Sequence, residues 1–266
     1  MFMHHNADFT RIFISIIIAA IYSVTFLNLA SISGVASETE ILSVVGFLFS
    51  VANFSGVFTA LGVQGCTKLE MDLYQRERAS NYYSIFPWLF SSTLIELPWL
   101  FIQAVVIIVI TYWSVGFDSV PWKFFYFLLV MYLNIVSYCF MGQLFVYGTP
   151  NLILSQMITS NICQLFAIFS GFLAPYATAP SGWRWMLRIT PTYWTVYGLS
   201  TAQYQGSEIM VSTSVNATVS VTDYLETAYG YNESLMWWVP LILLAYCISS
   251  KFLSFMALTF LRFTKR

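Results

Sequence analysis

The chain has 266 residues, of which 58% are hydrophobic and 9% charged, whereas soluble domains average roughly 45–50% and about 25%. A formal net charge of −1 provides no basic surface for nucleic acid, so that class of partner is excluded. The mean hydropathy of +0.72 and the long apolar runs predict an integral, multi-pass helical membrane protein.

Six apolar segments are long enough to cross a bilayer. We predict a helix for each, because hydrocarbon offers no partner to unpaired backbone groups. The expected fold class is therefore all-α, with residues 1–266 forming a single domain of six transmembrane helices. The predicted spans are about 9–29, 42–66, 87–115 (interrupted at Pro98), 122–147, 152–173 and 235–260.

The basic residues predict the orientation of these helices, because cytoplasmic segments carry an excess of Lys and Arg. With six spans both termini share the richer side, so we expect cytoplasmic termini and a long exterior loop, residues 174–234, between the fifth and sixth helices. Two sequons in that loop make Asn216 and Asn232 possible glycosylation sites. The richer side holds Arg11, Lys68, Arg76, Arg78, Arg262, Lys265 and Arg266, and the other holds Lys123, Arg184 and Arg188.

A dense run of charge separates the second and third spans. It extends from Thr67 to Ser84 and reads TKLEMDLYQRERASNYYS. Because the run is short and lies between two apolar spans, we predict a polar break that sits in water at the cytoplasmic face. What this stretch contacts there is central to the function.

Small residues recur every four positions in two of the spans. Such stripes let helix backbones approach closely in lipid. Two interpretations stay open: packing within this bundle, or a seam with a second copy or half. The second span carries Ala52, Gly56 and Ala60, and the fifth carries Ser155, Thr159, Cys163, Ala167 and Gly171.

Glu96 is the costly residue within the spans, because a carboxylate at the centre of a bilayer is unfavourable by about 2.5–3.5 kcal/mol. It is either a proton or coupling-ion site, or a structural acid bonded to backbone groups freed at Pro98. Asn161 and Gln164 of the fifth span either bond between helices or face a cavity.

We predict no catalytic residue and no metal site. The histidines, His4 and His5, lie at the extreme N-terminus, and the four cysteines lack metal-ligand spacing. The segment from Gly62 to Lys68 lacks the spacing of a phosphate-binding loop, so we expect no nucleotide hydrolysis by this chain alone.

The charged run carries a family resemblance. Tyr74–Ala79 followed by Tyr82–Ser84 resembles the "YRERA…YS" signature of G-type ABC transporters, and more narrowly the pleiotropic drug resistance group. The likeness covers nearly the whole chain in the same order, and its last part is most similar to the C-terminal membrane domain of full-size members. Further matching segments are Glu96–Pro98, Gly116–Phe117, Thr149–Asn151, Ser170–Leu173, Trp183–Trp185, Pro191–Leu199 and Asp223–Leu225.

The resemblance implies an ABC-2 type (type V exporter) fold that pairs with a second transmembrane half. ATP and Mg²⁺ would bind a separate cytosolic nucleotide-binding domain, and no cofactor would bind this chain. Arg76, Glu77 and Arg78 would couple the two domains. The substrate cavity and the valve above it would involve Phe58, as an aromatic clamp, together with Asn161, Phe172 and Leu173.

We therefore expect the membrane-spanning part of an ATP-driven efflux transporter of the plasma membrane. Its substrates would be hydrophobic or amphipathic compounds such as drugs, lipids and sterol-like molecules. The sequence contains no nucleotide-binding domain and no connecting helix before the first span, so it reads as a fragment of a longer protein. Two alternatives stay open: a non-transporting fragment or scaffold, and an ion-coupled carrier that uses Glu96.

Overall fold

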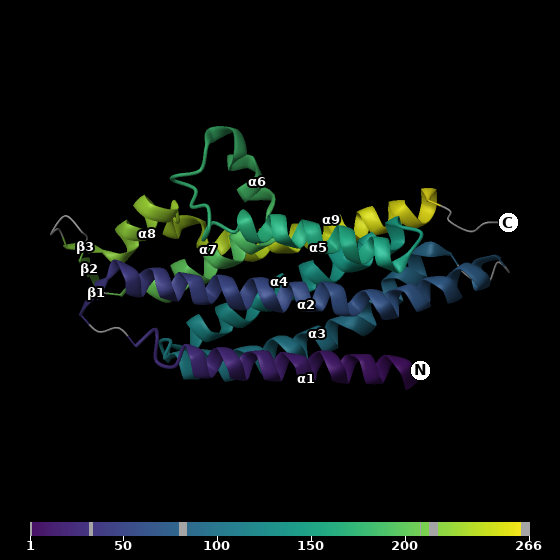
Figure 1. Cartoon of the computed structure of the whole chain (residues 1–266), viewed down its shortest axis with the longest axis horizontal. Helices are drawn as coiled ribbons and strands as arrows, with labels where there is room; N and C mark the ends of the chain where they lie inside the picture. The colour runs from purple at the N-terminus through teal and green to yellow at the C-terminus, as the bar shows by residue number, and fades with distance from the viewer. Residues whose placement is uncertain (1, 32–33, 80–83, 208, 213–217, 262–266) are drawn as a thin grey trace.

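Long apolar helices run side by side along one axis of the protein (Figure 1). The computed structural model describes residues 2–31, 34–79, 84–207, 209–212 and 218–261. Across these described residues the six longest helices are α1 (Phe2–Thr25), α2 (Glu38–Ala79), α3 (Ile85–Val115), α4 (Pro121–Gly148), α5 (Leu152–Ile168) and α9 (Val239–Phe260).

The two ends of the bundle differ in what they carry (Figure 1). At one end α1 begins, α9 ends, and the chain passes from α2 to α3 and from α4 to α5. The opposite end carries the shorter elements that connect α5 to α9 and a small sheet. These elements are η1 (Ser181–Trp183), α6 (Arg184–Ile189), α7 (Pro191–Tyr204), α8 (Val221–Tyr229), η2 (Glu233–Trp238), β1 (Val35–Ser37), β2 (Met210–Ser212) and β3 (Thr218–Ser220).

Length and composition make four described helical stretches able to cross a membrane: Glu38–Arg78, Ile85–Val115, Pro121–Gly148 and Glu233–Phe260. Two further apolar helical stretches are shorter: Phe9–Thr25, which is part of α1, and Leu152–Ile168, which is α5. The fifth predicted span, residues 152–173, is too long, because α5 ends at Ile168 after 17 residues, about 25 Å of helix. Gly171, with φ of +82°, then turns the chain away.

The charged run after the second span is not a break in the helix. α2 continues unbroken from Glu38 to Ala79, 42 residues, which is about 63 Å at 1.5 Å per residue and twice the thickness of a bilayer core. The charged residues of the run that lie in α2 are Lys68, Glu70, Asp72, Arg76, Glu77 and Arg78, and all of them except the aspartate are good helix formers. Their charge marks a change of solvent rather than the end of a helix.

The predicted interruption at Pro98 is also wrong. α3 passes through Pro98 as one helix of 31 residues. Proline is tolerated in membrane helices because neighbouring groups can satisfy the backbone that it frees.

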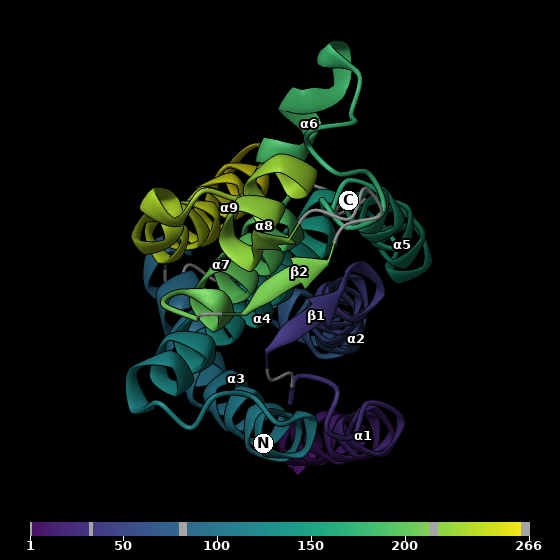
Figure 2. The ribbon, with the colours of Figure 1, turned by 90° about the vertical axis from the view of Figure 1, so that its left-hand side faces the viewer.

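The fold is not purely helical, because a three-stranded sheet lies at the end of the bundle opposite the charged end of α2 (Figure 2). β1, between α1 and α2, pairs in parallel with β2, and β2 pairs antiparallel with β3. Ala36 of β1 and Val211 of β2 are partners in register and fully buried. Residues 174–234 therefore contain helices and strands that dock on the connection before α2, whereas α6 projects from the bundle in both views (Figures 1 and 2).

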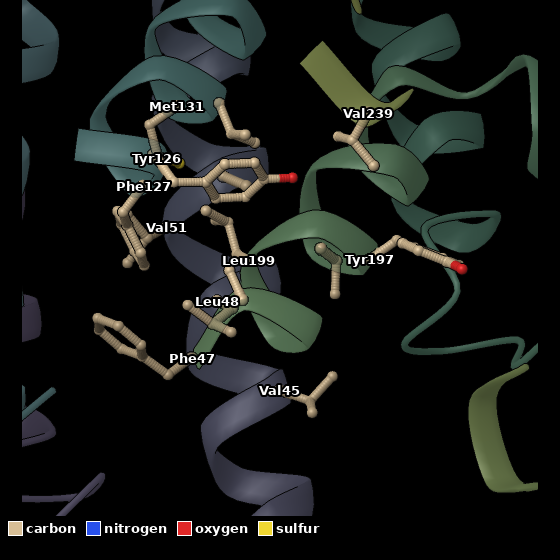
Figure 3. Packing of buried hydrophobic residues seen from close by; sticks show 14 of the residues in the cluster. Val45, Phe47, Leu48, Val51, Tyr126, Phe127, Met131, Tyr197, Leu199 and Val239 are labelled. Atoms are coloured by element: carbon tan, nitrogen blue, oxygen red, sulfur yellow. The ribbon is translucent and has the colours of Figure 1, made fainter. Parts of the chain in front are cut away.

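The core forms where α2, α4, α7 and α9 meet (Figure 3). Every residue of α7 is buried except Trp194, which is half-buried. Two of its threonines bond to α4: Thr195 donates to Asn134 Oδ1 at 3.1 Å, and the hydroxyls of Thr192 and Tyr138 lie 2.5 Å apart. α7 is thus an internal element, positioned by α4 rather than by solvent.

The small-residue stripe of α2 packs inside this bundle. A Cβ added at Gly142 of α4 would collide with the carbonyl oxygen of Ala60, and one at Gly56 would meet the Tyr138 ring. The stripe of α5 also faces inward, because Ser155 and Thr159 are fully buried. Of the two interpretations left open by the sequence, the structure supports internal packing for both stripes.

The close approach of α2 and α4 predicts that Gly142→Ala destabilises the protein. The added methyl group would press on Ala60 backbone, which cannot move aside as a flexible side chain can, and overpacking costs about 1–3 kcal/mol. We expect a lower midpoint of thermal unfolding, read with a thiol-reactive dye on the buried cysteines.

Gly65→Ala of α2 is the matched control. Nothing lies within 4 Å of a Cβ added there, and replacing a helical Gly by Ala stabilises by roughly 0.5–1 kcal/mol. Equal midpoints for Gly142→Ala and Gly65→Ala would contradict the close approach.

Candidate functional site

The charged end of α2 is held by an aromatic cluster. Tyr74 stacks on Trp88 of α3 with ring centroids 4.3 Å apart, and Trp88 meets Tyr147 of α4 edge-on at 5.9 Å. Burial of such rings provides most of the cohesion here. The cluster fixes this end of α2 against α3, α4 and α9 and consists of Met71, Tyr74, Ile85, Leu89, Val146, Tyr147 and Leu258.

The three predicted coupling residues differ in their surroundings. Arg76 and Glu77 are exposed, whereas Arg78 is half-buried. The Arg78 guanidinium donates to the carbonyl oxygen of Leu258, near the C-terminus of α9, at 3.2 Å. A cation at a helix C-terminus is favourable, since the last carbonyls lack partners within the helix. Arg78 therefore braces α2 against α9, and Arg76 and Glu77 form the outward surface.

Glu77 also borders a recess of about 200 Å³ beside the aromatic cluster. Glu70 lies in the same recess and accepts a 3.3 Å hydrogen bond from Ser92 of α3. On either side of Glu70 in the sequence, Lys68 and Asp72 pair at 3.1 Å along α2. The polar face of the helix end is thus organised by contacts within α2 and to α3.

A second candidate surface is the uncovered apolar face of α2 and α5. Phe58 of α2 is 48% exposed, and Met157 of α5 is 59% exposed. Asn161 lies on the exposed face of α5 and donates to the carbonyl oxygen of Met157 within its own helix, at 2.7 Å. The opposite faces of both helices are buried in the bundle, so each presents one open stripe. The exposed apolar residues of this surface are Phe54, Phe58, Ile153, Leu154, Met157, Leu165 and Ile168.

The two predicted valve residues point into different environments. Phe172 stacks on Phe49 of α2, with centroids 5.3 Å apart and planes at 19°. Its ring also lies 2.9 Å from the position of a Cβ on Gly46. Leu173 is 58% exposed. Phe172 is therefore a packing contact between the chain after α5 and α2, and Leu173 is on the surface.

Glu96 pairs with Arg11 of α1. The two side chains are 14% and 11% exposed, respectively, and the thiol of Cys139 lies 3.7 Å from Glu96 Oε1. The predicted bonding to backbone groups freed at Pro98 is therefore replaced by an ion pair, because α1 packs alongside α3. A buried carboxylate needs a partner charge, and Arg11 supplies it.

A buried glutamine was missed by the reading of the sequence. Gln64 of α2 is 0% exposed. Its amide nitrogen lies 3.2 Å from Gly142 O, 3.1 Å from Ser155 Oγ and 2.6 Å from Thr159 Oγ1. It therefore joins α2 to both α4 and α5. The Ser155 and Thr159 stripe was the available signal, since hydroxyls spaced by four residues also create a row of hydrogen-bonding partners.

The sequon at Asn232 is exposed and its backbone is fixed. Asn232 N–H donates to the Tyr197 hydroxyl at 2.7 Å, and Asn232 Oδ1 accepts from Ser234 N–H at 2.9 Å. Nearby, burial raises the pKa of Tyr229 to about 12, so that ring is neutral at physiological pH. Asn216, the other predicted glycosylation site, lies outside the described residues.

Metal binding finds no support among the described side chains. No group of three or more His, Cys, Asp or Glu residues within them could hold an ion.

Comparison with known families matches residues 2–204 to the family described as ABC-2 type transporter and residues 192–266 to that described as CDR ABC transporter. The chain is 27% identical over 263 residues to ABC transporter G family member 53 of Oryza sativa subsp. japonica, covering 98% of this chain and 18% of that protein. It is 30% identical over 236 residues to Pleiotropic drug resistance protein 1 of Nicotiana tabacum, covering 89% and 16%. It is 32% identical over 228 residues to ABC transporter G family member 36 of Arabidopsis thaliana, covering 85% and 16%.

The apolar helices and these matches define an integral membrane domain of an ABC transporter. The chain belongs to the ABC-2 type transporter family, and its relatives are G-type transporters of the pleiotropic drug resistance group. The resemblance drawn from the charged run is confirmed. The chain spans 16–18% of the length of these three relatives.

The ion pair between α1 and α3 predicts that Glu96→Gln destabilises the protein. The substitution leaves the Arg11 charge without its carboxylate partner, and breaking a buried pair from one side costs about 3–5 kcal/mol. We expect a lower midpoint of thermal unfolding at neutral pH. The double variant Arg11→Met with Glu96→Leu should recover much of that loss, because neither charge then remains.

Recovery in the double variant separates a structural pair from an ion-carrying carboxylate. If Glu96→Gln unfolds at the wild-type temperature, the pair does not hold α1 to α3.

Proposed function

We propose that this chain is the membrane-spanning part of an ATP-driven efflux transporter for hydrophobic or amphipathic compounds such as drugs, lipids and sterol-like molecules. ATP and Mg²⁺ would bind a nucleotide-binding domain outside this chain, and a second transmembrane half would complete the pathway. The observation that carries the proposal is that α2 is one continuous helix of 42 residues. One helix joins an uncovered apolar face, which includes Phe58, to an exposed charged end at Arg76 and Glu77.

The proposed topology has six spans, with both termini cytoplasmic and residues 174–234 exterior, in the plasma membrane. This arrangement is supported by the positions of the helix ends, because α1 begins and α9 ends at the charged end of the bundle (Figure 1). The spans would be α1 to α5 and α9. The likeness of residues 170–225 to the C-terminal membrane domain of full-size members favours the second of two halves.

The coupling surface would be Arg76 and Glu77. Both side chains are exposed at the end of a helix that is anchored by Tyr74, Trp88 and Tyr147. Arg78 would act from behind, by bracing α2 on α9. A nucleotide-binding domain that pushes on this end would move the helix as a body, because the anchoring cluster joins it to three neighbours.

The substrate cavity would form between the uncovered faces of α2 and α5 and the same faces of a second half. Phe58 and Asn161 would contribute an aromatic ring and an amide to a largely apolar wall, and Gln164 of α5, which is also exposed, would contribute a second amide. Leu173, exposed at the end of that wall, would form the valve, with Phe172 holding its segment against α2. A broad apolar surface with few polar groups suits substrates that differ in shape.

Glu77→Ala tests the coupling surface. We expect ATP-driven efflux to be lost while membrane insertion and thermal stability are retained, because the Glu77 side chain is exposed. Efflux from vesicles and ATP hydrolysis are measured on the full-length protein that contains this chain.

Lys68→Ala is the control, since it removes a charge from α2 that pairs with Asp72 within the helix. Wild-type efflux in Glu77→Ala would overturn the assignment of this residue, and loss of efflux in both variants would point to a general effect of charge.

Asn232→Gln tests the topology. If residues 174–234 are exterior, the wild-type protein made in a glycosylating cell should carry a glycan on the exposed Asn232. Deglycosylation would then increase its mobility on a gel, and the increase would be smaller or absent in the variant. Modification by an impermeant lysine reagent at Lys68 in intact cells would contradict the proposed orientation.

A further inference from the structure

A recess of about 230 Å³ lies between α1, α2 and α3, beside Phe58. α1 packs chiefly on α3, where Phe9 meets Trp99 edge-on at 6.2 Å and Arg11 pairs with Glu96. The aliphatic part of the Arg11 side chain also lies against α2, because its Cγ and Cδ are 3.4 Å from the position that a Cβ on Gly62 would occupy. The recess exists because Gly62 has no side chain to fill it. It is lined by Thr10, Arg11, Ile14, Ser15, Phe58, Gly62 and Gln103.

The lining combines polar and apolar groups within helices that are otherwise apolar. Gln103 is only 4% exposed and uses its amide nitrogen to donate to Thr59 Oγ1 at 2.8 Å. Its carbonyl oxygen is the acceptor that this side chain offers to a ligand. Arg11 brings a guanidinium, a group with N–H donors only. Donor and acceptor therefore lie at one recess, at the depth of apolar segments where water is scarce.

The charge of the recess selects the kind of polar group. Glu96 already balances Arg11, so an anion would compete with Glu96 for the guanidinium, and a cation would compete with Arg11 for the carboxylate. A hydroxyl is neutral, and it can donate to the glutamine carbonyl. The polar part of the lining therefore suits an alcohol better than a carboxylate, an amine or an ether.

The size of the recess and its surroundings indicate the rest of the ligand. Sites that enclose a drug-sized ligand measure roughly 300–1,000 Å³, so this recess takes only one polar group and the atoms next to it. The ligand must continue outside, along Ile14, which is 38% exposed, and Phe58, which is 48% exposed. An apolar chain lying on these residues would remain in the bilayer.

We propose that the recess between α1, α2 and α3 binds the hydroxyl end of a neutral, long-chain amphipath from the bilayer, with the hydroxyl donating to the Gln103 carbonyl and the chain on Ile14 and Phe58. Phe58 is shared with the proposed substrate cavity, so a role of this site in transport rests on the proposed function. Binding itself requires neither ATP nor a nucleotide-binding domain.

The test uses the full chain in phosphatidylcholine nanodiscs and three photoreactive probes with the same C16 chain: the alcohol, its methyl ether and the carboxylic acid. Peptide mass spectrometry measures labelling of α1 and of the Phe58–Gly62 region. We expect the alcohol to label these peptides at least about fivefold more than the ether, because the ether leaves the buried Gln103 carbonyl unpaired. Unlabelled hexadecanol should compete.

Two leucine variants provide matched substitutions on α2. Gly62→Leu fills the recess and should reduce alcohol labelling at least about tenfold. Gly65→Leu adds the same side chain less than one turn away, where nothing lies within 4 Å, and should leave labelling unchanged. Gln103→Leu should bring labelling by the alcohol down to that by the ether. Thermal unfolding checks that each variant is folded, and if Gly62→Leu fails to fold, the probe series on the wild type and Gln103→Leu still decide.

Equal labelling by alcohol and ether in the wild type would overturn the hydroxyl site, as would a Gly62→Leu variant that labels normally. Strongest labelling by the carboxylic acid would overturn the inferred neutrality of the ligand. If labelling behaves as expected but efflux is absent from the full-length transporter, the site stands and the proposed function fails. If efflux is intact and labelling is nonspecific, the proposed function stands and the hydroxyl site is overturned.

Discussion

The close packing of α2 on α4 is the contact on which the remaining structure depends. Gly142 allows α4 to touch the backbone of Ala60, and Gly56 makes room for the Tyr138 ring. Helices in lipid gain little from the hydrophobic effect against each other, so close approach and hydrogen bonds must hold them. Both are present at this seam, because Gln64 of α2 bonds to Gly142 O as well as to α5. The positions of α5, α7 and α9 follow from the α2–α4 pair.

Polar groups within the apolar helices serve this same arrangement. Arg11 pairs with Glu96, Lys251 donates to Gln143 Oε1 at 2.6 Å, and Asn134 donates to Ala52 O at 2.9 Å. Each of these bonds joins two helices that are far apart in the sequence. A polar group without a partner in hydrocarbon is costly, so these contacts also define which neighbours a helix can have. Packing sets how close the helices lie, and polar pairing sets which faces meet.

The sequence predicted the order of the long apolar helices, because hydrocarbon demands long apolar runs with satisfied backbones, and four of the described helices are long and apolar enough to cross a membrane. It failed where a residue's effect depends on its neighbours. Pro98 was predicted to interrupt α3, but α3 passes through it as one helix. The charged run after Cys66 was predicted to be a break, but α2 continues through it to Ala79. The partner of Glu96 could not be found, because Arg11 lies 85 residues away in the sequence. The strands were missed since three-residue segments have no periodicity to detect.

The predicted site residues divide along the same line. The exposure of Arg76 and Glu77 follows from local polarity, whereas the bond of Arg78 to Leu258 depends on how α9 ends. Because α2 is unbroken, that charged end is joined rigidly to β1 at the other end of the bundle. The junction is tight: Ser37 N–H donates to Glu40 Oε2 at 2.9 Å and Glu40 N–H to Ser37 Oγ at 3.3 Å, a capping box directly after the strand. A force on the charged end of α2 would therefore act on the same helix that this capping box joins to the sheet.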